Sequence, residues 1–489
     1  MSEAAVRVVI VGRSVAAAMA AMHLVRSLPP TAASIAVVAS ADDETDPFGD
    51  IETSLPGFAH WNARFGISEA DLVREGCLSF SLGTAFSGWA ATGGTSFQPL
   101  GETGASLEGV AFHQVAQRLR QTGTAVRLSD YSLAALAAQA GRFSYPSADP
   151  ASPLSLLAYG VHIDQPLYAR SLLREAASLG VALPSPVLRD IVRSPDGDLA
   201  CLLLSDGTRI EGDLFIDATG KAASLMSKVS TSTWNSWSHW LPCNHSVTRH
   251  GPADAPPAPY AHIVAEPAGW RRIVPGVGSV SETVVTVTNA QPTDRDDPIT
   301  EHHFDQGRRR AAWVGNCIAI GQAATLLEPT VPLGLELLHH SLERLAELFP
   351  HGAPTPAERS EYNRRFAEEA NRARDAVIAR YVLGKRQGAW WEGLRQQEPP
   401  PELAAKIALF RSRGRIPLLD GDLLDEGDWA NLFDAQGERA RRYDALADAI
   451  PLPQLQSQLG RMRQAMIAAV APLPRHGDFL AEIVRSRAA

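Results

Sequence analysis

The first forty residues alternate between short apolar runs and a segment with helical periodicity. Residues 6–11 are a β-branched run, residues 15–28 form an alanine-rich helical segment that ends at Pro29-Pro30, and residues 34–39 are a second apolar run. Short buried runs on either side of a helix are typical of a βαβ unit with parallel strands. The pattern therefore predicts the first unit of an α/β fold.

The same alternation returns after residues 90–155, a stretch of weaker periodicity that we interpret as a peripheral insertion. Beyond it the pattern predicts a helix at 164–179, strands at 187–192, 199–204, 209–217 and 313–321, and helices at 333–349, 358–383 and 452–470. Residues 213–220 end a strand in a glycine turn, and such a segment returns to the nucleotide domain in glutathione-reductase-type flavoproteins. We therefore expect a discontinuous nucleotide domain.

These elements divide the chain into three regions. The predicted fold is α/β, with a glutathione-reductase-type (Rossmann-like) FAD domain, a β-rich substrate module and a helical C-terminal region. The ranges are 1–90, 155–230 and 300–350 for the FAD domain, 91–154 and 231–299 for the substrate module, and 351–489 for the helical region. A cofactor is expected where strands of the first region end in glycine turns.

The turn after the first strand resembles a dinucleotide-binding fingerprint that has lost two of its three glycines. The pattern G-x-G-x-x-G reads here Gly12-x-Ser14-x-x-Ala17. Gly12 permits the tight turn and Ala17 is a mild change, but the Ser14 side chain intrudes where a glycine lets the backbone approach a pyrophosphate. The helix that begins at Val15 and Ala16 still offers N–H groups and a positive dipole. The turn predicts a scaffold for a flavin or nicotinamide cofactor, with a weakened hold on its phosphates.

The second strand lacks the acid that usually takes the ribose hydroxyls. It runs into Ala39, and the carboxylates Asp42 and Asp43 lie only beyond that point. Either carboxylate could reach the ribose around a turn. We interpret this stretch instead as a solvated loop.

Composition excludes several classes of function. The chain has 489 residues, a net charge of −9 and 45% hydrophobic residues, as in an ordinary globular protein. The acidic balance argues against nucleic acid, and no run of 18 apolar residues predicts a membrane span. The four cysteines show no metal-ligand spacing, so free thiols and a cytoplasmic location are expected. His339 and His340, adjacent on a helix, cannot chelate one ion together, and no metal is expected.

Several further segments resemble the flavin-dependent tryptophan halogenase family. Residues 313–329 read W-V-G-N-C-I-A-I-G-Q-A-A-T-L-L-E-P, residues 269–275 read G-W-x-x-I-x-P, and segments 80–89 and 159–164 follow the family's order. The resemblance runs over nearly the whole chain. It implies FAD reduced by a flavin reductase, a hypohalous acid activated by a lysine, and a glutamate that assists substitution on an aromatic or indole-like substrate, free or carried on a peptide.

Two catalytic positions of that family are changed in this chain. The lysine of F-K-x-x-I-x-F falls at Ser81, and the second glutamate of E-P-L-E-S-T-G falls at Val331. The second tryptophan of W-x-W-x-I-P is Arg272, which is expected to relax or abolish the separation of oxygenation from the substrate. Serine carries no charge and valine takes no proton, so halogenation by the lysine and glutamate mechanism is not expected.

The resemblance also implies which residues hold the flavin. The family loop G-x-G-E-x-T-x-P corresponds to residues 49–56, which contain Glu52, and the Thr-Gly pair of the halide site corresponds to Leu333-Gly334. Together with the glycine turns, the expected cofactor-binding residues are Gly12, Ser14, Val15, Ala16, Glu52, Asp217, Gly220, Gly321, Pro329, Leu333 and Gly334.

Three functions stay open at this point. The first is a divergent flavoprotein, an FAD-dependent monooxygenase or oxidase that oxygenates an aromatic or indole-like group. The second is a non-catalytic halogenase homologue, a pseudoenzyme that binds a ligand or a partner such as a halogenase-like paralogue. The third is a halogenase that uses other residues. The retained helix N-terminus at the flavin turn places the first ahead.

Overall fold

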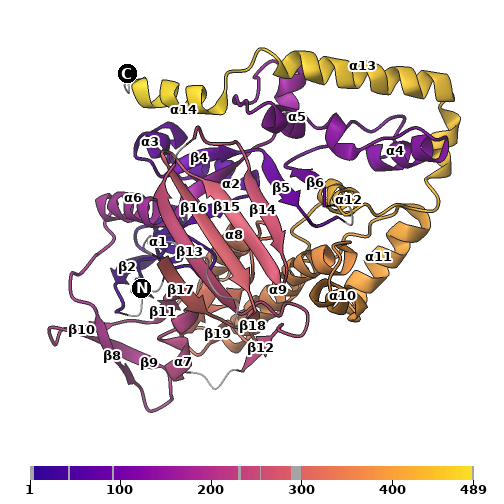
Figure 1. Ribbon diagram of the computed structural model, residues 1–489. Helices are drawn as coiled ribbons and strands as arrows, with labels where there is room; N and C mark the ends of the chain where they lie inside the picture. The colour runs from indigo at the N-terminus through magenta and orange to yellow at the C-terminus, as the bar shows by residue number, and fades with distance from the viewer. Residues whose placement is uncertain are drawn as a thin grey trace.

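The computed structural model describes residues 5–41, 45–90, 93–229, 233–253, 255–287 and 299–486. Asp42 and Asp43, the alternatives for a ribose-binding acid, lie outside the described residues. A large antiparallel sheet crosses the molecule, and the helices of the C-terminal region lie along one side and across the top of it (Figure 1). The N-terminal βαβ unit lies at the opposite side of that sheet (Figure 1).

A five-stranded sheet forms the nucleotide-binding-type core. Its order is β19-β20-β11-β1-β2, in which β20, β11, β1 and β2 are parallel. The strands are β1 (Val6–Val11), β2 (Ala33–Val38), β11 (Leu214–Asp217), β19 (Trp313–Val314) and β20 (Cys317–Ala319). Their continuous apolar runs are buried, as a parallel sheet covered on both faces requires. The predicted βαβ unit is confirmed, and strands from three distant segments build one sheet.

Three helices pack together beside this sheet, and the first of them contacts strands β1 and β2. They are α1 (Val15–Ser27), α6 (Gln165–Ser178) and α8 (Gly334–Glu347), and α1 packs against both of the others. The alanines of α1 are buried because their small side chains let the helix lie close to its neighbours. The N-terminus of α1 follows directly from the end of β1, so it faces the edge where the parallel strands end.

The segment 209–217 differs from its prediction as a single strand. β8 (Leu188–Arg193), β9 (Leu199–Leu204) and β10 (Arg209–Glu211) form a separate antiparallel sheet, and β11 starts beyond Gly212. A Cβ at Gly212 would lie 2.9 Å from Val9 Cγ2 and 2.8 Å from the Phe215 ring. The chain therefore bends past β1 at a glycine, and the turn divides the run into two strands. Residues 313–321 are likewise a short hairpin rather than one strand.

The central antiparallel sheet has the order β17-β13-β16-β15-β14-β5-β6. Its strands are β5 (Gly83–Ser87), β6 (Thr95–Pro99), β13 (His245–Pro252), β14 (Ala261–Glu266), β15 (Gly269–Pro275), β16 (Ser279–Thr286) and β17 (Ile299–His303). β5 and β6 pair across residue 90, so the predicted domain boundary lies within a hairpin of this sheet. The sheet thus combines the predicted substrate module with the strand that follows Ser81.

Two small sheets and several short helices link the main layers. One sheet contains β3 (Ile51–Thr53), β7 (Gly160–Asp164) and β4 (Leu78–Ser81), and the other contains β12 (Trp234–Ser236), β18 (Gly307–Arg309) and β21 (Thr325–Leu326). The short helices are α2 (Gly57–Arg64), α3 (Glu69–Arg74) and α7 (Met226–Val229). The order β3-β7-β4 brings strand β3, which contains Glu52, and strand β4, which contains Ser81, onto one sheet.

The C-terminal region is helical, as predicted. Its helices are α9 (Pro356–Leu383), α10 (Ala389–Gln396), α11 (Pro401–Arg413), α12 (Glu426–Ala435), α13 (Leu452–Val470) and α14 (His476–Arg485). α9 begins at a capping box in which Thr355 and Glu358 each bond the other's backbone N–H. Pro356 follows at the first helical position, where its missing N–H costs nothing. These signals explain why the sequence predicted this helix to within two residues.

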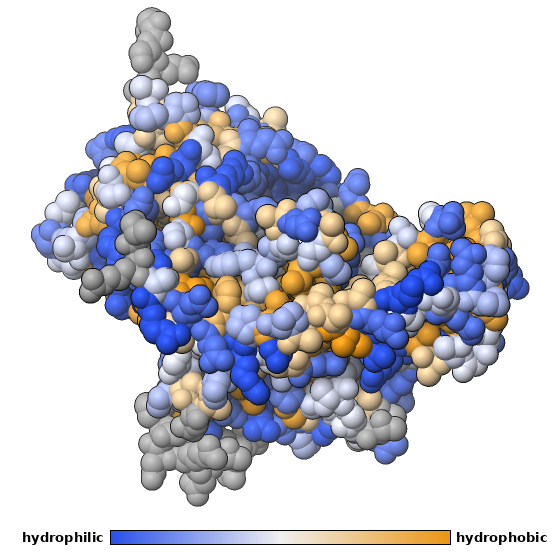
Figure 2. All heavy atoms as spheres, turned by 90° about the horizontal axis from the view of Figure 1, so that it is seen from above, coloured by the Kyte–Doolittle hydropathy of each residue, from blue (hydrophilic) through white to orange (hydrophobic). Residues whose placement is uncertain are grey.

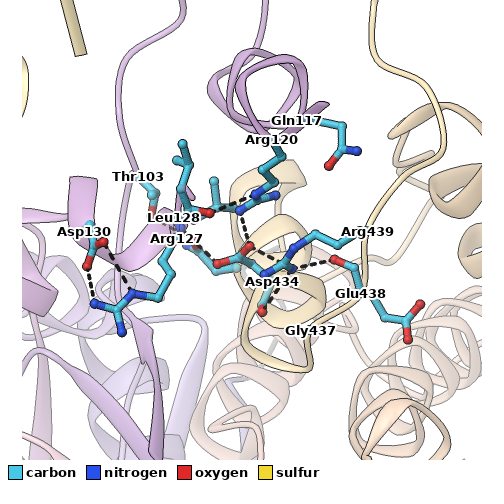
Figure 3. A network of polar contacts seen from close by, with 12 residues as sticks. Thr103, Gln117, Arg120, Arg127, Leu128, Asp130, Asp434, Gly437, Glu438 and Arg439 are labelled. Carbon is cyan, nitrogen blue, oxygen red and sulfur yellow. Dashed lines mark hydrogen bonds and ion pairs between the residues drawn. The ribbon is translucent and has the colours of Figure 1, made fainter. Parts of the chain in front are cut away.

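The insertion at 93–154 is tied to the helical region by a buried ion pair. α4 (Phe112–Gln121) and α5 (Leu133–Gln139) lie beside α12 and α13. The Asp434 carboxylate on α12 accepts hydrogen bonds from Arg120 Nη2 at 2.5 Å and from the Leu128 N–H at 2.9 Å, and Arg439 lies at 3.0 Å (Figure 3). Arg120 and Asp434 are both largely buried. The insertion is therefore part of the packed core.

The surface and the cysteines agree with a globular chain. The face seen in Figure 2 mixes polar and apolar side chains over most of its area. Among the described residues, the helices are all too short or too polar to span a bilayer. Cys77, Cys201, Cys243 and Cys317 are buried and free.

A candidate flavin site

A cavity of about 280 Å³ lies where the parallel strands end. The β1–α1 turn, the turn after β11, the turn after β20 and the first residues of α8 surround it. Eight of the predicted cofactor-binding residues line it: Ser14, Val15, Ala16, Glu52, Gly220, Gly321, Pro329 and Gly334. Gly12, Asp217 and Leu333 are absent from its lining. Arg13 also lines it, a cation that sequence reasoning did not single out.

The β1–α1 turn uses Ser14 in a way that the fingerprint did not predict. Gly12 has a φ of +124°, a conformation that requires glycine, and its N–H donates to the Val38 carbonyl at 2.8 Å. Ser14 is the N-cap of α1: its hydroxyl accepts from the Ala17 N–H at 3.5 Å and donates to the Ala218 carbonyl at 2.9 Å. The hydroxyl is therefore held by the turn after β11 and caps the helix.

Asp217 organises the neighbouring turn from within the protein. Its carboxylate is fully buried and accepts from the Thr219 hydroxyl at 2.7 Å and from the Leu225 and Met226 N–H groups at 2.9 and 2.8 Å. Because these bonds fix the backbone on which Gly220 stands, Asp217 shapes the cavity without lining it. The prediction that Asp217 helps to bind the cofactor stays a prediction, with Asp217 placed behind the cavity wall.

Gly321 allows the turn after β20 to approach the first turn of α1. Its φ is +56°, and a Cβ there would lie 2.9 Å from the Ala16 Cβ. Any larger residue would push the two turns apart. The turn after β20 and the first turn of α1 therefore form adjoining cavity walls of backbone and small side chains.

Buried acids and one arginine close the cavity on the side of the 46–54 loop. Burial raises the pKa of Glu52 to about 7, although Arg272 opposes the shift, and burial also raises the pKa of Asp46. The Arg272 guanidinium lies 3.6 Å from Glu52 Oε1 and donates to the Ile51 carbonyl at 3.1 Å and to the Thr53 hydroxyl at 2.9 Å. Only 2% of Arg272 is exposed. This residue fastens the loop to the central sheet.

The two positions of the family's catalytic side chains lie outside this cavity. Ser81 and Val331 are both buried, and neither lines the cavity. The Ser81 hydroxyl donates to the Gly83 carbonyl at 3.4 Å, at the end of β4. Val331 contributes its carbonyl to the Leu333 N–H at 2.8 Å, just before α8. The Ser81 side chain ends in a hydroxyl and the Val331 side chain in an isopropyl group, and neither group carries a charge.

A buried polar network that the sequence did not predict adjoins Val331. Glu328 accepts from the Tyr381 hydroxyl at 2.5 Å and from Gln306 Nε2 at 3.0 Å, and Trp270 Nε1 donates to the same Tyr381 hydroxyl at 3.0 Å. Burial raises the pKa of Glu328. The Glu-Pro pair and Trp270 belong to recognised motifs, but Tyr381 comes from α9 and no motif indicated it.

Three further histidines, His162, His339 and His340, have structural partners. The buried His162 ring lies 3.1 Å from the Pro275 carbonyl through Nδ1. His339 and His340 each face an acid one turn away on α8, Glu343 and Glu336, at 3.3 Å. The two histidines thus point to different partners, as their spacing predicted. Glu336 is paired with His340 at 3.3 Å.

A second cavity of about 480 Å³ lies between the β5–β6 hairpin and the end of α12. Phe97 and Tyr260 line it with ring centroids 5.7 Å apart in an edge-to-face arrangement. Arg127, Lys385 and Arg439 bring three cations to its rim, two of them labelled in Figure 3. Aromatic surface beside cations suits an aromatic ligand that carries an acidic group.

The parallel sheet, its glycine turns and the cavity at their ends define an α/β protein with a Rossmann-like nucleotide-binding domain. The tryptophan halogenase family model matches residues 7–452, and the chain belongs to that family. The resemblance read from the sequence is therefore confirmed.

Relatives and solved structures agree with this assignment. The chain is 24% identical over 440 residues to KtzR, a 7-chloro-L-tryptophan 6-halogenase of Kutzneria sp. (strain 744), covering 83% of this chain and 85% of the relative. Its match to SttH, a tryptophan 6-halogenase of Streptomyces toxytricini, is 24% identical over 282 residues, 54% of this chain and 53% of the relative. The structure of BrvH, a flavin-dependent halogenase from Brevundimonas sp. BAL3, superposes with a TM-score of 0.91 at 29% identity, covering 98% of this chain and 99% of that one.

Proposed function

We propose that this chain binds FAD and catalyses the oxidation or oxygenation of an aromatic or indole-like substrate, free or carried on a peptide, without halogenating it through a lysine and a glutamate. The observation that carries the proposal is the cavity at the strand ends. It is lined by most of the predicted flavin residues but by neither Ser81 nor Val331. A flavin reductase is the expected electron donor.

The residues of the cavity fit a dinucleotide. The first-turn N–H groups of α1 have no acceptor within the helix, and Val15 and Ala16 bring them to the cavity with the positive end of the helix dipole. Arg13 adds a positive side chain for a pyrophosphate. The small residues Ala16 and Gly321 let the backbone come close to the ligand. A bound flavin would supply two-electron redox chemistry with oxygen.

The side chains at the lysine and glutamate positions argue against halogenation. A lysine activates hypohalous acid through its ammonium or as a chloramine, and the Ser81 hydroxyl offers neither. A carboxylate takes the ring proton, and the Val331 side chain has no basic atom. Glu328 is a carboxylate nearby, but Tyr381 and Gln306 already bond its oxygens.

The 480 Å³ cavity is the proposed place for the aromatic substrate. Phe97 and Tyr260 would contact the ring, and a substrate carboxylate would share the cations Arg127, Lys385 and Arg439 with their present partners Asp130, Glu438 and Asp434.

A non-catalytic role is the second candidate. It is favoured because Ser81 and Val331 are buried and their side chains offer neither a charge nor a base for catalysis. In that case the chain would bind a ligand or a halogenase-like paralogue through the same fold.

Flavin titration separates the two candidates. We expect FAD to bind with a dissociation constant of about 1 μM or tighter, seen as a shifted visible spectrum. With a flavin reductase, indole and bromide, mass spectrometry should then detect an oxygenated product and no brominated one. Absence of binding at about 100 μM FAD would overturn the enzymatic proposal in favour of the non-catalytic one. A brominated product would overturn both.

Ser81→Ala provides the matched control for the catalytic part. The Ser81 hydroxyl makes one long hydrogen bond, to Gly83, so its removal should leave FAD affinity and turnover unchanged within about twofold. A tenfold loss of turnover with unchanged FAD affinity would show that Ser81 acts in the reaction.

A further inference from the structure

Two histidines and a glutamate meet at the edge of the central sheet. β17 is the last strand of that sheet and pairs antiparallel with β13 (Figure 1). His245 on β13 lies directly opposite His303 on β17. Glu301 precedes His303 by two residues, so it projects from the same face. Opposed side chains on adjacent strands lie about 5 Å apart at Cβ, which places all three groups around one point.

The donor atoms already lie near the spacing that a metal ion requires. His245 Nε2 is 2.6 Å from Glu301 Oε1, and His303 Nε2 is 3.9 Å from the same oxygen. The three donor atoms all lie within 4.8 Å of one another. Ligands of a tetrahedral zinc ion, each about 2.1 Å from the metal, are about 3.4 Å apart. Movements of less than about 1 Å would therefore lengthen the His245–Glu301 distance and shorten the His303–Glu301 distance to this value.

Burial and exposure suit a site that an ion enters from solvent. The His245 side chain is 6% exposed and stands on the interior side, whereas Glu301 and His303 are 52% and 66% exposed. Two imidazoles and one carboxylate match zinc and similar borderline divalent ions, whereas magnesium and calcium prefer oxygen ligands. Water would complete the fourth position.

We propose that His245, Glu301 and His303 bind one zinc-class divalent transition-metal ion on the outer face of β17. No motif indicated this site, because its ligands come from two strands and lie 56 and 58 residues apart, without the short spacing of a metal motif. No part of the proposal depends on FAD binding or on the proposed reaction.

The ion would brace the edge strand next to the flavin cavity. On the opposite face of β17, His302 lies 3.0 Å from the Thr45 hydroxyl, and Thr45 lines the cavity. The Lys221 ammonium donates to the His303 carbonyl at 3.0 Å, and its neighbour Gly220 lines the same cavity. A metal that fixes the positions of β13 and β17 would therefore raise the thermal stability of this edge.

Calorimetry with zinc and absorption spectroscopy with cobalt test the site on the full chain, first stripped with chelator. We expect one zinc ion per chain, visible bands of tetrahedral cobalt, and a higher melting temperature with zinc. His303→Ala should weaken zinc binding at least tenfold and abolish the cobalt bands, and Glu301→Gln should weaken it several-fold. His351→Ala, which removes another exposed histidine, should change nothing.

Two results would overturn the proposal. One is a failure to bind a stoichiometric zinc ion at about 100 μM. The other is zinc affinity and cobalt spectra that are the same in His303→Ala as in the natural chain. Because His303 is largely exposed, its replacement leaves the fold intact, and circular dichroism of the variant verifies this.

Discussion

The flavin cavity and the region around Ser81 and Val331 both depart from the family's sequence pattern, but the departures differ in what they remove. At the cavity, Ser14 and Ala17 replace glycines, yet the N-terminus of α1 and the glycine turns still surround an open space. At Ser81 and Val331, the motif correspondence predicts that a serine and a valine occupy the places of the family's reactive lysine and glutamate. A site made from backbone N–H groups tolerates substitutions that a site made from a lysine and a glutamate does not.

Strand β15 connects the two regions. Arg272 and Trp270 are two residues apart and therefore project from the same face. Arg272 fastens the loop that contains Glu52 beside the cavity, and Trp270 donates to Tyr381 in the Glu328 network near Val331. The motif correspondence predicts a tryptophan of the family at the position of Arg272, and in this chain the arginine holds the segment by hydrogen bonds and charge. A substitution of Arg272 therefore tests most directly whether the cavity and the region around Val331 depend on the same strand.

Arg272→Met should have the largest effect on stability. It removes hydrogen bonds to Ile51 and Thr53 and leaves the buried Glu52 without its cation. Removing one partner of a buried ion pair typically costs about 3–5 kcal/mol of unfolding free energy. We expect a loss of up to that size in chemical denaturation at neutral pH, because a pKa of about 7 lets Glu52 take up a proton when Arg272 is absent, with weaker FAD binding because Glu52 lines the cavity.

The adjacent Arg271 provides the matched control. Its side chain is 38% exposed and pairs with Glu266 and Glu282 on the surface, so Arg271→Met should cost less than about 1 kcal/mol. Adding Glu52→Gln to Arg272→Met should recover part of the loss, because the amide needs neither a cation nor the uptake of a proton in this buried position. Equal losses for the two arginine variants would contradict the role given to Arg272.

Gly321→Val tests whether the flavin cavity depends on backbone approach. The substitution places a branched side chain at a φ of +56° and against Ala16, so it should separate the turn after β20 from α1. We expect at least a tenfold loss of FAD affinity, about 1.4 kcal/mol, in a visible titration. Gly460→Val in α13, where a Cβ meets open space, is the control. Undiminished FAD affinity in a folded Gly321→Val protein would refute the close-approach argument.

The sequence predicted the elements that local signals determine. The capping box at Thr355 and the proline after it set the start of α9, and the β-branched run at 6–11 set β1. The prediction of a single strand at 209–217 was wrong, because the bend at Gly212 depends on how closely the chain packs against Val9. Hydrophobic periodicity reports the burial of a strand but not the sheet in which it pairs.

The candidate site was predictable only where a motif covers it. Family motifs indicated Ser81, Val331 and the glycine turns, but they did not indicate that the Ser14 hydroxyl bonds Ala218. Tyr381 and the group around His303 were not predictable, because each is brought to its partners by long-range packing. Side-chain chemistry assembled across distant elements leaves no spacing to read.

His340→Gln should have the smallest effect and sharpens the comparison at α8, the helix that starts just after Val331 and contributes Gly334 to the cavity. Hydrogen bonds with Glu336 and then Glu369 raise the pKa of His340 from 6.5 to about 9. A raised pKa means that the protonated histidine stabilises the fold fully below about pH 6.5 and loses this contribution as pH rises through about 9. Because the side chain is 37% exposed, the contribution is screened to less than about 1 kcal/mol.

The variant should therefore show a flatter decline of unfolding free energy between about pH 6 and pH 9.5 than the natural chain. His351→Gln should keep the natural slope, since His351 is exposed, and an unchanged slope in His340→Gln would show that this pair does not anchor α8.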